Sequence, residues 1–312
     1  MDAPPSQHNE SRTDIETEQA ADANTDTTDP RSPDAGLSDT AGDRLRQLGV
    51  MAHHEYRLSL RNRWAAGLTL LIGGFATMLV WFGGSNIGPT RSGPLIASLA
   101  SLATYLLPLA GLMFGHTLVV GDDERGWLSM LFALPTPRWL IIVGKYLGRA
   151  VTLSAATAIG FGVAGVALGL RLTGAFPAGI YATVLVASVG VGLAFLSLGT
   201  VISTLSPSRT HALGGSLLVW LWFVFVHDLV ALGIIAAFDV GGQILSVFVF
   251  LNPTTSYRVL VLRIAGTQGG AFAAVFAETV LTTSLLVWTL LAWLVLPLVV
   301  ATFVTSDRLS SA

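Results

Sequence analysis

The sequence predicts an all-α polytopic membrane protein with a bundle of six membrane-spanning helices. Of its 312 residues, 52% are hydrophobic and only 12% are charged. A chain of this composition has too few polar side chains to cover a water-exposed surface. Its hydrophobic residues also gather in six runs, each close to the roughly 20 residues that a helix needs to cross a bilayer. These runs are 64–82, 95–120, 146–170, 180–205, 211–238 and 281–304.

The amino-terminal residues 1–43 differ in composition from the rest of the chain. They hold 11 of the 19 acidic residues and almost no aliphatic ones. Such a stretch cannot bury enough apolar surface to offset the conformational entropy that is lost on ordering. We therefore expect a disordered acidic cytoplasmic tail at 1–43, a transmembrane domain at 44–304 and a short cytoplasmic tail at 305–312.

Basic residues near the ends of the runs indicate the orientation. With the amino terminus inside the cell, eleven Lys or Arg residues lie near cytoplasmic ends and four lie near the opposite ends. Cytoplasmic loops of membrane proteins carry the excess of Lys and Arg. Together with an even number of spans, this predicts a multi-pass protein of the plasma membrane with both termini in the cytoplasm. The chain has no basic patch with aromatic residues, so we expect no nucleic acid partner.

A segment just before the first run has an amphipathic pattern. Apolar residues recur at helical spacing over 48–64, and the opposite face holds His53, His54, Arg57 and Arg61. A helix with one basic face and one apolar face that contains aromatic residues lies well in the headgroup layer of a membrane. We expect an interfacial helix here. A basic anchor that sets the topology and has no further role is the alternative.

The segment 239–278, between the fifth and sixth runs, is ambiguous. Its apolar stretches 244–251 and 257–265 are too short to cross a membrane, and Asn252-Pro253 separates them. A re-entrant or interfacial helix pair on the outer face fits this pattern, because non-helical backbone at membrane depth must be buried in protein. Treating the stretches as additional spans would give seven or eight.

The loop 121–135, between the second and third runs, is charged at its start and amphipathic afterwards. Asp122, Asp123 and Glu124 suit the amino-terminal end of a helix, and Pro135 would end that helix. The residues that would share its adjoining turns are Trp127, Leu128, Leu131 and Phe132. A connector that only joins two spans needs no apolar side chains facing the cytoplasm, so the loop is predicted to be a docking surface.

Several motifs around this loop resemble those of type 2 ABC transporter permeases, the ABC-2 type membrane subunits, with the NosY-like branch the most similar. They are Glu124-Arg125-Gly126, Leu134-Pro135, Arg138, Gly144-Lys145-Tyr146-Leu147-Gly148-Arg149, the stretch 55–64 and Leu251-Asn252-Pro253. Their order and their placement relative to the six runs match that family over about residues 50–304. Trp127 and Pro137 differ from the residues that are usual in the family at these positions.

The resemblance implies a permease with an amino-terminal elbow helix, a short cytoplasmic coupling helix and an outer re-entrant segment before the last span. The elbow helix would contribute Glu55, Arg57 and Arg61. The residues that would couple to the ATPase are Asp122, Asp123, Glu124, Arg125, Gly126, Trp127, Leu128, Leu131, Pro135 and Arg138. Because this chain contains no phosphate-binding loop, ATP would bind a separate cytoplasmic ABC ATPase. A second permease chain, identical or related, would complete a transporter that exports an unidentified substrate.

Two ionisable residues, His227 and Asp228, lie inside the fifth run. Such residues are costly in the hydrocarbon core and usually face the bundle interior or a water-filled path. They are therefore candidates for substrate translocation or proton relay, with packing between helices as the alternative. An ATPase-independent secondary transporter and a membrane scaffold are the other functions that we consider.

The sequence predicts no catalytic residue, cofactor or metal site in this chain. Neither the H-E-x-x-H motif of zinc proteases nor the G-x-S-x-G motif of hydrolases is present. Met113 and His116 share one helix face, a spacing that could hold a soft metal ion. With five Met and no Cys in the chain, a packing role is the better prediction for this pair.

Overall fold

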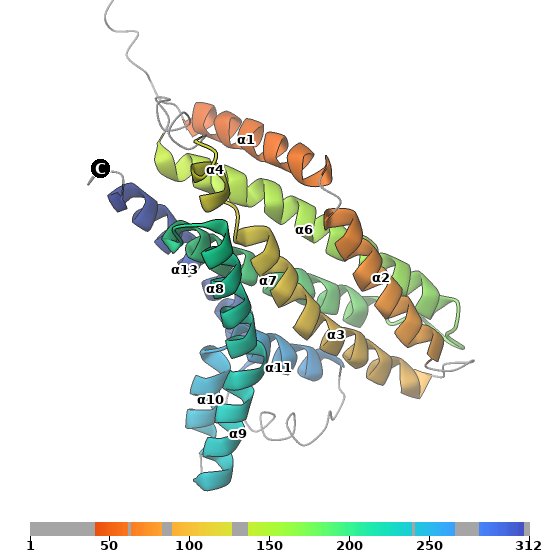
Figure 1. Cartoon of the computed structure of the whole chain (residues 1–312). Helices are drawn as coiled ribbons and strands as arrows, with labels where there is room; N and C mark the ends of the chain where they lie inside the picture. Colours follow the sequence, from red (N-terminus) through yellow and green to blue (C-terminus); the bar gives the residue numbers. More distant parts are fainter. Residues whose placement is uncertain are drawn as a thin grey trace, which may run out of the picture. The chain divides into compact units, whose positions relative to one another are not determined.

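The computed structural model describes residues 41–61, 64–82, 89–126, 137–238, 241–265 and 281–308. Within these ranges every regular element is a helix, which confirms the all-α class (Figure 1). Residues from Arg44 onward form one compact unit. Its longest helices are α1 (Ala41–Arg61), α2 (Trp64–Phe82), α3 (Pro89–Gly115), α6 (Arg138–Gly169), α7 (Ala178–Leu205) and α13 (Thr283–Arg308). The tail that we predicted to be disordered covers residues 1–43. Residues 1–40 lie outside the described ones, and residues 41–43 belong to α1.

The described residues contain five helices that are long and apolar enough to cross a membrane, at 92–123, 139–169, 178–205, 209–237 and 283–305. A sixth candidate is a bent pair, α10 (Gly242–Phe250) and α11 (Pro253–Ala265), with a bend of 115° between its helices. α2 has the bounds predicted for the first span, but its apolar part, Ala66–Phe82, is shorter than the five. The chain is therefore a multi-pass membrane protein, with five to six candidate spans in the part that the structure describes.

The span 209–237 consists of three consecutive elements: α8 (Arg209–Leu221), η1 (Trp222–Val226) and α9 (His227–Ala237). η1 is one π-helical turn, which interrupts the regular hydrogen bonding of an α-helix. Here the Phe223 carbonyl accepts hydrogen bonds from Asn252 Nδ2 (2.7 Å) and Thr254 Oγ1 (2.8 Å). The break between α10 and α11, predicted at Asn252-Pro253, therefore lies against the π turn of the span 209–237, which corresponds to the fifth predicted run.

α7 packs against α3, α6, α11 and α13. Its crossing with α3 is close because glycines meet there: a Cβ on Gly115 would lie 2.6 Å from the Leu196 carbonyl oxygen, and one on Gly111 would lie 2.3 Å from the Gly192 carbonyl oxygen. Small residues allow helices to approach closely in a membrane, where packing drives association. Tight packing through glycine is therefore a feature of the bundle centre.

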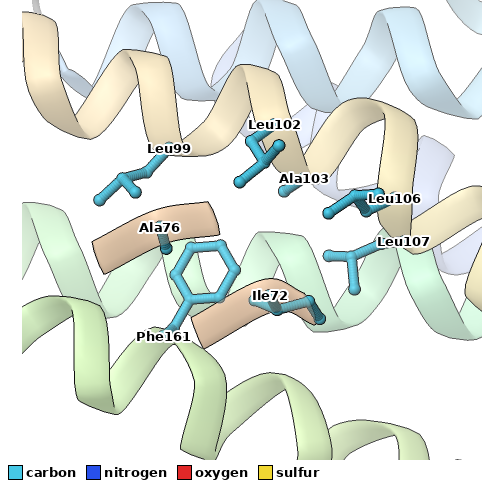
Figure 2. Close-up of a pocket in the computed structure, with 8 residues that line it drawn as sticks. All are labelled: Ile72, Ala76, Leu99, Leu102, Ala103, Leu106, Leu107 and Phe161. Carbon is cyan, nitrogen blue, oxygen red and sulfur yellow. The ribbon is translucent and has the colours of Figure 1, made fainter. Parts of the chain in front are cut away.

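α2 packs on α6, and α3 completes an apolar part of the core at this place. Figure 2 shows the side chains of the three helices pointing toward one another; they are Ile72, Ala76, Leu99, Leu102, Ala103, Leu106, Leu107 and Phe161. These eight side chains carry no polar group, so this part of the core contributes stability and no chemistry. The charged residues considered below lie elsewhere in the chain.

Candidate functional site

The chain that follows α3 leads into the segment predicted to be a docking surface. It forms one helical turn, α4 (Val120–Asp123), and then a turn that ends at Gly126. Ser203 Oγ of α7 accepts hydrogen bonds from the backbone N–H groups of Val119 (2.9 Å) and Val120 (3.1 Å), which a helix start leaves free. Gly126 has a φ of +72°, a left-handed conformation that favours glycine. The remainder of the predicted helix, with Trp127, Leu128, Leu131 and Pro135, lies outside the described residues.

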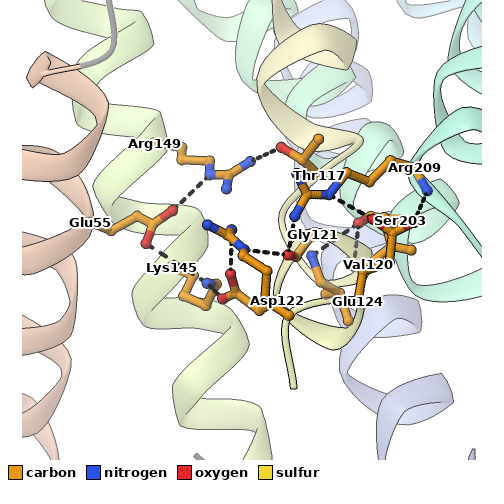
Figure 3. Close-up of polar contacts among 12 residues, drawn as sticks. Glu55, Thr117, Val120, Gly121, Asp122, Glu124, Lys145, Arg149, Ser203 and Arg209 are labelled. Carbon is orange, nitrogen blue, oxygen red and sulfur yellow. Dashed lines mark hydrogen bonds and ion pairs between the residues drawn. The ribbon is translucent and has the colours of Figure 1, made fainter. Parts of the chain in front are cut away.

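Four charged residues pair beside α4: Glu55 of α1, Asp122 of α4, and Lys145 and Arg149 of α6 (Figure 3). Arg149 Nε donates to Glu55 Oε1 at 2.9 Å, and Lys145 Nζ lies 3.8 Å from Glu55 Oε2. Lys145 also forms an ion pair with Asp122. All four side chains are only 10–14% exposed. Because an unpaired buried charge is costly, each of these residues depends on the others.

The motif from Gly144 to Arg149 combines close packing with charge. A Cβ on Gly148 would lie 2.7 Å from the Ala52 carbonyl oxygen, so glycine allows α1 to lie directly on α6. Arg149 then reaches the end of α3, where its Nη1 donates to the Phe114 carbonyl and to Thr117 Oγ1 (3.1 Å). The carbonyls of a last helical turn lack partners within the helix, and a guanidinium satisfies one of them here.

A second set of contacts joins α4 to the start of α8. The backbone N–H of Arg209 donates to Glu124 Oε1 (2.8 Å), and its Nη2 donates to the Gly121 carbonyl (2.5 Å). Its Nε lies 2.9 Å from Glu124 Oε2 but makes no hydrogen bond among the described residues, so that contact is ionic only. We call Glu55, Asp122, Glu124, Lys145, Arg149 and Arg209 the charge network.

The structure brings four of the residues predicted for coupling and the elbow helix together in or beside this network: Glu55, Asp122, Glu124 and Arg125. Arg125 Nη2 donates to Asp122 Oδ1 at 2.8 Å. Asp123 is exposed, as is Gly126. The side chains of Arg57, Arg61 and Arg138 lie outside the described ones, so their predicted roles stay predictions.

Four residues that the sequence prediction did not select as site residues also belong here: Lys145, Arg149, Ser203 and Arg209. Lys145 is the only lysine of the chain and stands with Arg149 at the start of an apolar run, a signal that could have identified both. Ser203 and Arg209 carry no comparable signal. Their contacts with the α4 segment join residues 83 to 88 positions apart in the sequence.

The predicted translocation residues lie in a separate cluster between α9 and α11. Asp228 Oδ2 pairs with Arg258 Nη1 at 2.7 Å, and Thr255 Oγ1 donates to Asp228 Oδ1 at 3.3 Å. His227 is 7% exposed, and its ring lies against that of Phe248. Neither ring nitrogen of His227 has a hydrogen-bond partner in the described part of the chain. Asp228 is thus used in a contact between helices, whereas His227 only approaches it, with Nδ1 3.8 Å from Asp228 Oδ1.

The geometry around Met113 and His116 is that of ordinary helix packing. His116 Nδ1 lies 2.9 Å from the Met113 carbonyl oxygen, within hydrogen-bond distance. Among the residues that the structure describes, no three or more His, Cys, Asp or Glu side chains are grouped so that they could hold a metal ion.

The helices and the charge network together define a multi-pass membrane protein in which one end of the bundle is built from paired charges. The family model described as ABC-2 family transporter protein matches residues 49–307. The "Probable ABC transporter permease protein NosY" of Stutzerimonas stutzeri is 33% identical over 237 residues, which cover 73% of this chain and 85% of that protein. The protein of the same description from Pseudomonas aeruginosa is 33% identical over 219 residues, which cover 68% and 80%. The chain belongs to the ABC-2 family of transporter permeases, as its motifs indicated.

Proposed function

We propose that this chain is the membrane-spanning subunit of an ABC transporter and couples ATP hydrolysis by a separate cytoplasmic ABC ATPase to the export of a substrate. The observation that carries this proposal is the charge network. The segment that contains α4 leads directly into the predicted docking surface, and the network ties this segment to α1, α6 and α8. A segment held by several helices at once passes a displacement on to the bundle, because packed helices move as rigid elements.

In this proposal the predicted parts of the permease take the following places. The coupling helix that binds the ATPase lies within 122–135; its described start is not one continuous helix, because α4 ends at Asp123 and a turn with a left-handed Gly126 follows. α1 is the elbow helix, which Glu55 links to α6. The bent pair α10–α11 is the re-entrant segment on the outer face. Both termini are cytoplasmic, the membrane is the plasma membrane, and a second permease chain completes the transporter. No cofactor binds this chain, and ATP binds only the partner.

Copurification tests this proposal. When the tagged chain is purified in mild detergent from cells that contain its native partners, we expect an ATPase with a phosphate-binding loop to copurify. Trp127→Glu and Leu131→Glu should each release the ATPase, because they place a charge on the apolar docking surface. Phe238→Glu is the matched control: this apolar residue is 68% exposed at the proposed outer end, so the ATPase should stay bound.

Two results would contradict the proposal at different levels. An ATPase that stays bound to both variants would place the docking surface elsewhere. A wild-type chain without any ATPase would contradict the transporter subunit itself. In that case the secondary transporter becomes the better candidate, supported by His227, a buried ionisable residue beside the Asp228–Arg258 pair.

A further inference from the structure

The span 209–237, α8–η1–α9, contacts the residues 119–126, here called the docking segment, through Arg209, whose role the permease function does not yet explain. We propose that Arg209 is a positioning residue, which fastens this span to the docking segment so that a displacement of the segment moves the span. The inference rests on the proposed function, and it assigns to Arg209 and to this span the transmission of movement after ATPase docking.

The first support is the geometry of the contact. Arg209 is the first residue of α8, and both its backbone N–H and its side chain bind the α4 segment. The Glu124 carboxylate accepts that N–H at 2.8 Å, a favourable position for a negative charge at the start of a helix. The guanidinium adds the hydrogen bond to the Gly121 carbonyl and the ion pair with Glu124, so the side chain of Arg209 strengthens a link that its backbone N–H alone would leave to one hydrogen bond.

The second support is the loose packing of the span. In the apolar 18-residue window of the span 209–237, only 17% is buried inside the chain, compared with 61% for the window in 92–123 and 56% for that in 178–205. In a membrane, helices are held together by packing and by hydrogen bonds between them, so a helix with few packing contacts in the chain is held less firmly than a core helix. The specific contacts at Arg209 therefore have a large share in setting the position of this span.

The third support is the set of contacts farther along the same span. The Phe223 carbonyl in η1 binds Asn252 and Thr254, and Asp228 in α9 pairs with Arg258 of α11 at 2.7 Å. If α8 moves, η1 and α9 therefore pass the movement on to the bent pair α10–α11 through these contacts. The contacts form a continuous route from the docking segment, through Arg209, to the far end of the bundle.

A distance measurement tests the inference. The chain has no cysteine, so spin labels can be attached at Leu229→Cys on α9 and Val186→Cys on α7, which are 68% and 70% exposed. In the permease–ATPase complex in liposomes, the label-to-label distance is measured by pulsed electron paramagnetic resonance without nucleotide and with ATP plus vanadate. We expect the nucleotide to change the distance in the otherwise wild-type chain. Arg209→Ala should lose more than half of the change while the complex retains its ATPase.

The controls separate positioning from folding. Arg209→Lys should recover part of the change, since lysine keeps the charge but not the several donors of arginine. Arg171→Ala removes an arginine that lies over Trp81 instead of the α4 segment, and it should keep the full change. If Arg209→Ala does not fold, Glu124→Gln weakens the same contact from the other side and should also reduce the change.

The outcomes distinguish this inference from the proposed function. A full distance change in Arg209→Ala, or in Glu124→Gln where the first variant does not fold, overturns the role of Arg209 and leaves the transporter subunit intact. If the nucleotide does not change the label-to-label distance in the wild-type complex, the role of Arg209 is likewise overturned and the transporter subunit stays intact. A wild-type preparation without bound ATPase overturns the proposed function, and the inference with it.

Discussion

At the scale of single residues, several largely buried charges among the described residues are stabilised by partners from other helices. Glu55 pairs across to α6, and Asp228 pairs across to α11. His227 is different, because its ring is buried and its nitrogens make no hydrogen bond to any described residue. A buried polar group without a partner costs stability, and a functional need for that group is one physical reason to keep it. The role of His227 in translocation therefore stays a specific proposal.

We predict that Lys145→Met lowers the free energy of unfolding by about 2 kcal/mol, because the ion pairs with Asp122 and Glu55 are lost in a largely buried place. The effect should appear as a lower midpoint of thermal unfolding in detergent. Asp122→Asn should have a similar effect. The double variant should lose less than the sum of the two, by more than about 0.5 kcal/mol, because the two residues share one interaction.

Leu147→Ala is the control for that double-mutant cycle, since Leu147 lies in the same turn of α6 and is 40% exposed. It should change the midpoint only slightly. Strictly additive effects of Lys145→Met and Asp122→Asn would mean that the ion pair contributes nothing to stability.

At the scale of elements, the bundle depends on glycines where helices cross and on one interrupted helix. A Cβ on Gly115 of α3 would lie 2.8 Å from Cα of Gly199 on α7, which leaves no room for a side chain, and one on Gly199 would be in tight contact at 3.0 Å. The π turn η1 has a complementary role, because it lies where Asn252 and Thr254 bind the Phe223 carbonyl. Close crossings make the centre rigid, and the π turn marks the place where the fifth span departs from a regular helix.

We predict that Gly115→Ala destabilises the protein by about 1–3 kcal/mol, because the added methyl group would overlap the backbone of α7. Gly162→Ala on α6 is the matched control, since a Cβ there meets no atom within 4 Å. Alanine is the better helix former, so this control should be neutral or stabilising by up to about 1 kcal/mol. Equal midpoints of thermal unfolding for the two variants would contradict the close crossing.

At the scale of the whole molecule, the chain is a multi-pass membrane protein of the ABC-2 family. The charge network gathers at one end of the bundle, beside α4 and the starts of α6 and α8. The excess of Lys and Arg near the same ends is the physical reason to place this end in the cytoplasm. The proposed docking of an ATPase at this end requires the same orientation, because a docking surface must face the compartment that holds the ATPase.

Cysteine labelling checks this orientation in intact cells. We predict that Leu170→Cys and Phe238→Cys react with a membrane-impermeant maleimide from outside, whereas Leu45→Cys reacts only after the cells are opened. All three leucine or phenylalanine side chains are well exposed, and the chain has no cysteine of its own. The reverse pattern would invert the topology and would exclude docking of a cytoplasmic ATPase at α4.

The class of protein could be predicted from the sequence alone, because the length and composition of apolar runs determine which segments cross a bilayer. The bounds of α2 and the break at Asn252-Pro253 followed from the same local pattern. Local motifs also predicted a docking surface that begins near Asp122, which stays a prediction. In each case the evidence lies in neighbouring residues, which a sequence displays directly.

Only the tertiary structure decided how the polar groups pair. Glu124 and Arg209 are 85 positions apart, and the spacing of residues along the chain contains no information on a contact over that distance. The π turn was equally hidden, because Trp222–Val226 is as apolar as the helices around it. Hydrophobicity determines that a helix enters the membrane, but the packing of one helix on another determines which charges meet and which segment can move which span.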